Sequence, residues 1–382
     1  MTNFYCAAPW RGLHINPRGD VKTCCAGNPN MLGNLDTQTI EQILNGPVLR
    51  EIQDTLRQGI MHETYCSGCI NREAKGGDSE RSWHNQVNED FDPVTAPDYF
   101  EFPAIVDVRW NTTCNLSCNY CDPSASSKWA AILKQPVISG TRHYYEQVCE
   151  YIEKHYDQVK EVALVGGEPL LLKENERLLD VIPTDCVVTI ITNLSTNLEN
   201  NAIFQKLAKR RNVSWSISFE NVRDRFEYVR HGAKWTTLLH NLDLVQDLKR
   251  TQGHWGGVHA VYNLFTATRL CEIKKFVWDR GLVIRWQNLY GPRLLDPRIY
   301  GSEVARLAAN EIERMYETCH VDDNERRYFD TMLAHYRGQT QPDPAALEQL
   351  DQYIKKLESE HHPDQAGQFA VSWPELESLL WH

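Results

Sequence analysis

The feature that most constrains the fold is a regular alternation of short apolar stretches with longer helical ones from residue 104 onward. Six stretches rich in β-branched and aromatic residues are typical of buried strands: 104–111, 160–166, 187–192, 213–220, 257–265 and 282–289. Helical patterns separate most of them, at 141–157, 173–181, 199–210, 234–250 and 268–279. Because strands that alternate with helices form parallel βαβ units, we expect an α/β fold with a parallel sheet over 104–290.

The flanking regions have a different character. Residues 1–75 hold five cysteines, a turn at Gly19 and one amphipathic helix candidate near 37–58. Residues 76–103 are polar, contain three prolines and show little periodicity, which predicts a linker. Residues 291–382 indicate a helical C-terminal region, with helices expected at 301–317, 324–337 and 344–359. We therefore expect a cysteine-rich N-terminal module, a linker, the α/β domain and a helical tail.

The net charge and the hydropathy of the chain limit the classes of function that it can have. The 40 basic and 51 acidic residues give a net charge of −11, which argues against a general nucleic-acid-binding surface. We see neither a membrane-spanning apolar stretch nor a signal peptide, and we expect a cytoplasmic protein that does not contact a membrane. Thiols stay reduced in that compartment, so the clustered members of the 12 cysteines point to metal rather than to disulfides.

The densest cysteine cluster comes directly after the first strand, in Cys114-Asn-Leu-Ser-Cys118-Asn-Tyr-Cys121. Three thiolates at this spacing can hold three irons of a cubane cluster. Because a closed site normally has four protein ligands, three would leave one metal corner open for a small molecule. A zinc site whose fourth ligand lies elsewhere in the chain is the alternative.

Two further strands carry polar or flexible residues, one at its end and one along a face. The second strand runs into Gly166-Gly167-Glu168-Pro169, where glycines allow a close backbone approach and the carboxylate can accept from an ammonium group. A simple strand-to-helix turn is the alternative. Strand 213–220 alternates, with Ser214, Ser216, Ser218 and Glu220 on one face, which predicts a polar face that lines a barrel interior.

The cysteine motif resembles the C-x3-C-x2-C signature of the radical S-adenosylmethionine (SAM) superfamily, and Tyr120 stands where that family has an aromatic residue. The turn at 166–169 is similar to the family's GGEP motif. The resemblance implies a partial (β/α)6 TIM-like barrel. It also implies that Cys114, Cys118 and Cys121 hold a [4Fe–4S] cluster with SAM at its open iron. One electron from that cluster would then yield a 5′-deoxyadenosyl radical, which abstracts hydrogen from a substrate.

The same resemblance assigns roles to single residues. It places Gly166, Gly167, Glu168 and Tyr120 against SAM, and it adds the polar positions Asn193, Ser216, Ser218 and Arg230. Glu220 stands where the family more often has aspartate, and we expect it and Arg285 to act in catalysis. Arg109 and Asn111 share a face on the first strand, as Arg285 and Gln287 do on the sixth. Each pair could meet substrate, while a structural salt bridge is the alternative for each arginine.

The N-terminal cysteines offer a second set of ligands: Cys6, Cys24, Cys66 and Cys69, with Cys25 to spare. From the chemistry alone, zinc and an iron–sulfur cluster are equally good occupants. The order C-x2-PW, G-x4-CC and C-x2-C resembles the twitch/SPASM auxiliary-cluster module, which implies an auxiliary [4Fe–4S] cluster. The G-x4-C spacing selects Cys24. In that family the module usually follows the barrel, whereas here it precedes it.

The function expected on these grounds is radical SAM chemistry on a peptide or protein side chain, or on another small molecule, with a reductant such as flavodoxin or ferredoxin. Two alternatives remain. One is an enzyme that acts on a nucleotide or nucleic-acid base, for which Trp83-His84 and Arg285-Trp286 place aromatic beside basic residues. The other is a non-catalytic zinc or iron–sulfur regulator, whose basic binding face the acidic net charge disfavours.

Overall fold

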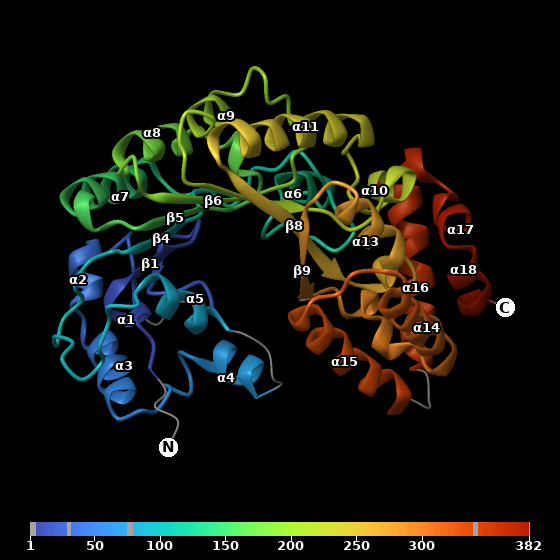
Figure 1. Ribbon diagram of the computed structural model, residues 1–382, viewed down its shortest axis with the longest axis horizontal. Helices are drawn as coiled ribbons and strands as arrows, with labels where there is room; N and C mark the ends of the chain where they lie inside the picture. The colour runs from blue at the N-terminus through green and yellow to red at the C-terminus, as the bar shows by residue number, and fades with distance from the viewer. Residues whose placement is uncertain (1–4, 29–31, 75–78, 290, 339–342, 382) are drawn as a thin grey trace.

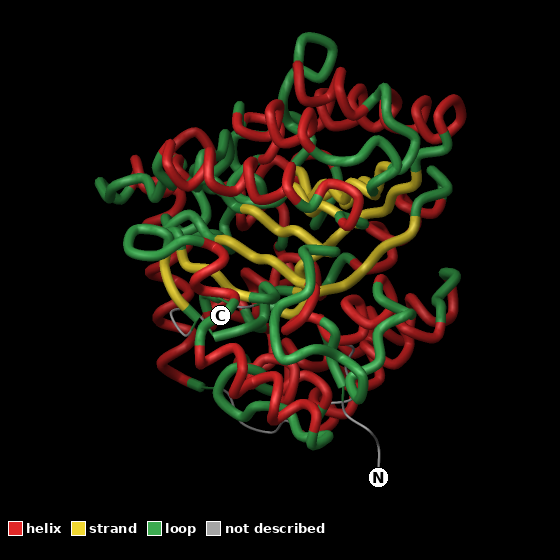
Figure 2. The backbone as a smooth tube through the Cα atoms, turned by 90° about the vertical axis from the view of Figure 1, so that its left-hand side faces the viewer, coloured by secondary structure: helices red, strands yellow, loops and turns green. Residues whose placement is uncertain are grey.

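The computed structural model describes residues 5–28, 32–74, 79–289, 291–338 and 343–381. Over these residues, nine strands form one sheet in the order β3-β2-β1-β4-β5-β6-β7-β8-β9. The strands are β1 (Gly12–Ile15), β2 (Asp20–Lys22), β3 (Gly33–Asn34), β4 (Ile105–Val108), β5 (Glu161–Leu164), β6 (Val187–Thr192), β7 (Val213–Ser218), β8 (Trp255–Tyr262) and β9 (Val283–Asn288). From β4 to β9 each strand pairs in parallel with the next one along the chain. The six predicted strands and their parallel order are confirmed, and the sheet is curved and open (Figure 2).

Helices cover the outer face of the parallel strands, with α7, α8, α9 and α11 lying over it in Figure 1. The helices of the α/β region are α6 (Ser127–Ile132), α7 (Arg142–Lys154), α8 (Glu174–Val181), α9 (Ala202–Leu207), α10 (Arg223–Val229), α11 (Trp235–Gln252), α12 (Leu264–Ala267) and α13 (Leu270–Trp278). The five helices predicted between strands are therefore present. The short helices α6, α10 and α12 were not predicted, because four to seven residues give too little periodicity to read.

Local sequence explains the boundaries of these elements. Thr141 caps α7 by accepting the backbone N–H of Tyr144, and Gly253 ends α11 at a φ of +75°, a conformation that glycine adopts without strain. The run Val187–Thr192 is β-branched throughout and forms β6 over the same residues. These local signals determine where each element begins and ends. The sheet itself is stabilised by burial against the helices.

The N-terminal module belongs to the same sheet as the barrel strands. Strand β1 pairs in parallel with β4, so that Gly12 is aligned with Ile105 and His14 with Asp107. Strands β2 and β3 then extend the sheet in antiparallel fashion. The module's helices are α1 (Ala8–Arg11), α2 (Ile40–Leu44), α3 (Pro47–Arg57) and α4 (Ser67–Glu73). The single helix predicted near 37–58 is two helices, because Pro47 cannot continue α2 and instead begins α3.

The segment predicted as a linker carries structure of its own. Of residues 76–103, those numbered 76–78 lie outside the described residues, and Glu80–Val87 form helix α5. Arg11 of the module forms ion pairs with Asp90 at 2.8 Å and Glu101 at 2.5 Å. The segment therefore packs along the N-terminal module. The proposed boundaries at 75, 103 and 290 stay predictions.

The C-terminal region is helical, as expected, and it packs against the end of the barrel beyond β9 (Figure 1). Its helices are α14 (Ser302–Thr318), α15 (Asp323–Gly338), α16 (Pro344–Lys356), α17 (Gln368–Ser372) and α18 (Pro374–Trp381). One apolar cluster of this region includes Leu350, Ile354 and Leu357, with Tyr120 and Cys121 packed against it. The tail therefore reaches the three-cysteine loop. Among the described helices, none combines the length and the apolar character that crossing a bilayer requires.

Candidate active site

The three-cysteine loop is held by the end of α10 and by the residues that follow it. The backbone amide of Ser117 donates to the carbonyl oxygen of His231 at 3.0 Å, and that of Asn119 donates to Val229 at 2.9 Å. Gly232, at a φ of +96°, lies against the same loop, since a Cβ there would be 3.2 Å from the carbonyl oxygen of Asn115. Backbone contacts therefore hold the loop in place.

The three thiols suit an iron–sulfur cluster. Cys118 is buried and Cys114 and Cys121 are partly buried, and this burial raises the pKa of all three thiols, that of Cys121 to about 12. Metals bind the thiolate form, so cluster loading must release protons. In the middle of the motif the side-chain amide of Asn119 is fully buried, and neither of its polar atoms has a hydrogen-bond partner among the described residues. Buried polar groups normally have partners, which a bound group could supply here.

The glycine turn and the cysteine loop fit against each other. A Cβ on Gly167 would lie 2.2 Å from the carbonyl oxygen of Thr113, the residue directly before Cys114. The backbone amide of Glu168 donates to that same oxygen at 2.8 Å. Gly166 has a φ of +132°, which only glycine adopts readily. The turn at 166–169 is therefore a support for the cysteine loop as well as a strand-to-helix connection.

Glu168 faces the protein interior and is fully buried. Its Oε1 accepts from the hydroxyl of Thr192 at 2.7 Å and from the backbone amide of Leu170 at 3.1 Å, and its Oε2 accepts from the backbone amide of Asn193 at 2.8 Å. Burial raises the pKa of this carboxyl group, and the three donated hydrogen bonds oppose that shift. A carboxylate has about four acceptor positions, so one remains for a ligand.

Asn193 connects this carboxylate to the cysteine loop. Its Nδ2 donates to Oδ1 of Asn115 at 2.9 Å and lies 3.8 Å from Sγ of Cys114. Its Oδ1 accepts from the backbone amide of Ser195 at 2.8 Å. Glu168, Asn193 and Cys114 therefore form one hydrogen-bonded series across the carboxyl ends of β4, β5 and β6.

A buried ion pair joins two further predicted residues. Arg230 and Glu220 are 2.9 Å apart, with 5% and 0% of their side chains exposed. Arg230 also donates to the hydroxyl of Tyr120 at 2.6 Å, and the second oxygen of Glu220 accepts from the backbone amide of Val261 at 3.3 Å. The structure thus brings the predicted SAM-binding residues Tyr120 and Arg230 together with Glu220, which was predicted to be catalytic.

The polar face predicted on strand 213–220 is present. Ser214, Ser216 and Ser218 are half-buried on the inner face of β7, while Val213, Trp215 and Ile217 are buried on the outer side. Strand pairing places Ser218 beside His259 of β8, and His259 beside Arg285 of β9.

The two arginines considered as substrate contacts differ in their surroundings. Arg285 is exposed, and no ion pair forms at its guanidinium among the described residues. Arg109, one residue beyond the end of β4, instead pairs with Asp107 of that strand at 3.0 Å, so the salt-bridge alternative applies to Arg109. Asn111 turns back onto the chain, where its Oδ1 accepts from the backbone amide of Thr113 at 2.8 Å.

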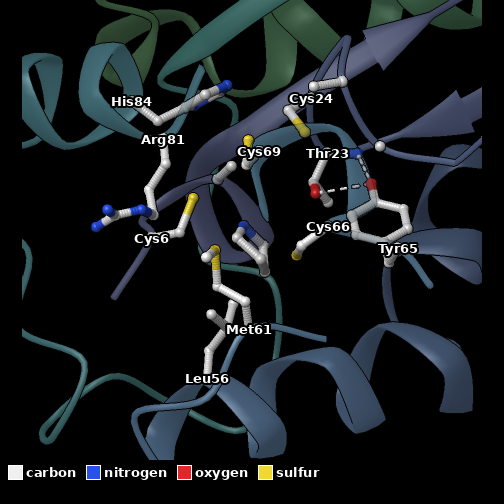
Figure 3. Close-up of a pocket in the computed structure, with 14 residues that line it drawn as sticks. Cys6, Thr23, Cys24, Leu56, Met61, Tyr65, Cys66, Cys69, Arg81 and His84 are labelled. Carbon is white, nitrogen blue, oxygen red and sulfur yellow. Dashed lines mark hydrogen bonds between the residues drawn. The ribbon is translucent and has the colours of Figure 1, made fainter. Parts of the chain in front are cut away.

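A second candidate site lies in the N-terminal module, where a small cavity, partly open to solvent, is lined by Cys6, Cys24, Cys66 and Cys69. Figure 3 shows these cysteines around the cavity, with Tyr65 on one side and Arg81 and His84 on the other. Cys25 does not line it. The structure therefore brings together the four cysteines that the spacing selected. Their role as ligands stays a prediction.

Burial raises the pKa of Cys6 to about 12 and that of Cys66 to about 11, and the neighbouring thiols add to both shifts. The thiols are thus close enough to interact, as ligands of one group must be. Among the described parts of the chain, no three histidine, cysteine or acidic side chains converge tightly enough to hold a single metal ion. Four cysteine thiols that line one cavity are the donor set that a [4Fe–4S] cluster takes.

Two contacts to the cysteine loop could not be found by sequence reasoning. The hydroxyl of Ser117 lies 3.0 Å from Nε2 of His362, a residue 245 positions further along the chain. The hydroxyl of Tyr353 donates to the carbonyl oxygen of Asn119. No local pattern marks these residues, because their roles depend on where the helical tail docks.

In each aromatic–basic pair considered for a nucleotide site, the two residues lie in different surroundings. Trp83 donates to Oε2 of Glu161 at 3.2 Å, while His84 lines the cysteine cavity. Trp286 donates to Glu325 at 3.2 Å, while Arg285 is exposed on the inner face. Neither pair presents its aromatic ring and its basic group to one common space.

Two family models match this chain. Residues 108–262 match the Radical SAM superfamily, and residues 6–70 match SPASM, an iron–sulfur cluster-binding domain. The sequence is also 39% identical over 89 residues to 7-carboxy-7-deazaguanine synthase of Clostridium acetobutylicum, a match that covers 23% of this chain and 36% of that protein. The chain therefore aligns with only about a third of this relative's length.

Among solved structures, native anSMEcpe with bound AdoMet is similar to this chain with a TM-score of 0.41 at 15% identity, covering 56% of this chain and 60% of that one. Streptococcus suis SuiB bound to its precursor peptide SuiA gives 0.41 at 13% identity, covering 72% and 66%. TM-scores this low carry no argument about the present chain.

The α/β region with its three-cysteine loop is a domain of the Radical SAM superfamily, a class whose members bind a [4Fe–4S] cluster and SAM. More particularly, this chain places an iron–sulfur cluster-binding SPASM domain ahead of its Radical SAM domain.

Proposed function

We propose that this protein is a radical SAM enzyme that abstracts a hydrogen atom from its substrate with the help of an auxiliary [4Fe–4S] cluster. The observation that carries the proposal is the direct packing of the Gly166–Pro169 turn on the loop that presents Cys114, Cys118 and Cys121. Once bound, the cluster would supply one electron to cleave the C5′–S bond of SAM into methionine and a 5′-deoxyadenosyl radical, and that radical would take a hydrogen atom from the substrate to give 5′-deoxyadenosine. The protein's part is to hold these groups in position and to exclude water.

Named residues divide this work. Cys114, Cys118 and Cys121 would hold three irons of the cluster, and Glu168, which has one acceptor position left, would accept from the ammonium group of SAM. Ser216 and Ser218 on β7 present hydroxyls to the barrel interior, where they would bind polar groups of SAM. Asn193 and Arg230 would act from the rim of the site, since each already contacts the cysteine motif or its Tyr120.

For the substrate we propose a peptide or protein side chain, in keeping with the SPASM domain, and for the reductant a flavodoxin or ferredoxin. Exposed Arg285 on the inner face of β9 would meet an anionic part of the substrate. A second candidate is a nucleobase-like small molecule, favoured by the local 39% identity to the deazaguanine synthase. Deuterium transfer from a labelled candidate substrate into 5′-deoxyadenosine would distinguish the two classes.

The central test needs no substrate. Anaerobically reconstituted protein with SAM and dithionite should form 5′-deoxyadenosine, and the combined Cys114→Ala, Cys118→Ala, Cys121→Ala variant should form none. The intact protein should hold about eight irons and eight sulfides, and the variant about half of each. Cleavage that persists in the triple variant would contradict the proposal. Iron near four in the intact protein, with one zinc, would show that the N-terminal module is a structural zinc site.

A further inference from the structure

The imidazole of His84 is a buried polar group beside the N-terminal cysteines. His84 is only 2% exposed, and it lines the cavity formed by Cys6, Cys24, Cys66 and Cys69. Its Nδ1 has no hydrogen-bond partner among the described residues. A buried ring nitrogen without a partner is unfavourable, so its position beside four thiols indicates that a bound group supplies the partner.

Helix α5 holds this imidazole firmly at the cavity. One residue after His84, Asn85 accepts from the backbone amide of Ala7 at 2.9 Å and donates to the carbonyl oxygen of Tyr5 at 3.1 Å. Three residues before it, Arg81 binds both carboxylate oxygens of Glu73, at 3.0 and 2.8 Å. Both anchors lie on segments that carry cavity cysteines, so α5 cannot turn His84 away without breaking them.

The backbone also leaves room for the ring. A Cβ on Gly12 would lie 2.7 Å from Cε1 of His84, so any larger residue there would push the imidazole aside. Gly12 opens β1, the strand that pairs with β4 of the barrel. His84 therefore stands where the module joins the barrel.

Other polar groups of the cavity wall are already engaged. The hydroxyl of Tyr65 accepts from the backbone amide of Thr23 at 2.8 Å and lies 3.0 Å from that residue's own hydroxyl (Figure 3). The guanidinium of Arg81 is bound to Glu73. Among the described lining residues, His84 is the one histidine, and its Nδ1 has no hydrogen-bond partner and could bond to a ligand.

We propose that His84 donates an N–H hydrogen bond to the auxiliary iron–sulfur cluster and thereby raises its reduction potential. Reduction adds negative charge to the cluster, and an N–H donor stabilises that charge more in the reduced than in the oxidised state. The inference rests on the proposed function, because it requires a cluster at the four N-terminal cysteines. In this arrangement the cluster has a hydrogen-bond donor besides its cysteine ligands, and its reduction potential depends on the position of helix α5.

The test uses full-length, anaerobically reconstituted protein that carries the Cys114→Ala, Cys118→Ala, Cys121→Ala changes, so that the auxiliary cluster alone gives a signal. Its midpoint potential is measured by redox titration followed by electron paramagnetic resonance. His84→Phe should shift the midpoint to a more negative potential, and His84→Gln, which keeps an N–H donor, should shift it less. Trp83→Phe is the matched control, since it removes an N–H donor of the same helix that points to Glu161. It should leave the potential unchanged.

A second measurement needs no variant at His84. Pulsed resonance on protein labelled with ¹⁵N in the histidine rings should show a weak nitrogen coupling to the reduced cluster. A midpoint that is the same in His84→Phe and in the parent, or no coupling at all, would overturn the proposal. A strong coupling typical of a direct iron–nitrogen bond would also overturn it, in favour of His84 as a ligand. If the parent protein held no iron, the proposed auxiliary cluster itself would be contradicted. The failure of that proposal can thus be told apart from the failure of the role given to His84.

Discussion

The backbone amide of Asn193 donates to Oε2 of Glu168 at 2.8 Å, which ties the end of β6 to the turn that follows β5. Asn193 in turn contacts Cys114. The carboxylate expected to meet the ammonium group of SAM is therefore also an internal brace of the cluster loop, and its loss should affect more than ligand affinity.

Glu168→Ala should weaken SAM binding and also destabilise the protein. The change leaves three donors without an acceptor, those of Leu170, Thr192 and Asn193. Each orphaned buried donor costs about 1–3 kcal/mol, so we expect a loss of roughly 3 kcal/mol or more in the free energy of unfolding. Urea unfolding followed by circular dichroism measures the stability, and equilibrium dialysis with labelled SAM measures the affinity. Reduced affinity at unchanged stability would limit Glu168 to ligand binding.

Gly167→Ala should lower the iron content of the barrel site. The added Cβ would meet the Thr113 carbonyl oxygen at 2.2 Å, a distance that only a shift of the cysteine loop can relieve. We expect less iron per chain and a reduced rate of 5′-deoxyadenosine formation. Gly338→Ala is the control, because a Cβ there meets nothing within 4 Å. Normal iron content in Gly167→Ala would show that the loop tolerates the displacement.

Arg230 and Arg285 should respond differently to replacement by methionine. Arg230→Met leaves the carboxylate of Glu220 buried without its ion-pair partner and should cost about 3–5 kcal/mol of stability. Arg285→Met removes an exposed side chain and should change stability by no more than about 0.5 kcal/mol. Urea unfolding of both variants tests the contrast. Product formation by a stable Arg285→Met variant, once a substrate is known, tests its proposed contact with substrate.

Changing Cys66 and Cys69 to alanine should remove the N-terminal cluster and still allow SAM cleavage, while substrate product is lost. SAM needs only the open iron of the barrel site, whereas a four-cysteine cluster acts by electron transfer or by shaping the substrate site. Since β1 pairs with β4, misfolding of the module could disturb the barrel. Circular dichroism and an intact barrel-cluster signal must therefore be checked first. Normal product formation in a folded variant would rule out an electron-transfer role.

Local sequence predicted most of the strands and the longer helices, and it selected cysteines that the structure brings together. Period-two alternation on β7 and the β-branched run of β6 predicted strands that the structure has at nearly the same residues. Such signals depend on neighbours within one turn or one strand, and so they survive in the sequence. The choice of Cys24 over Cys25 came from the G-x4-C spacing of the module that the sequence resembles, and the structure places Cys24 at the cavity.

Other features depended on the tertiary structure, because they join residues that are distant in the chain. Pairing of β1 with β4 merges the N-terminal module with the barrel, which no pattern within residues 1–75 indicates. The partner of Arg230 and the docking of His362 beside Ser117 were decided by how strands and tail pack. The position of His84 likewise follows from α5, in a segment whose polar composition suggested only a linker. The sequence therefore predicted which cysteines would bind iron, and packing determined which buried side chains surround them.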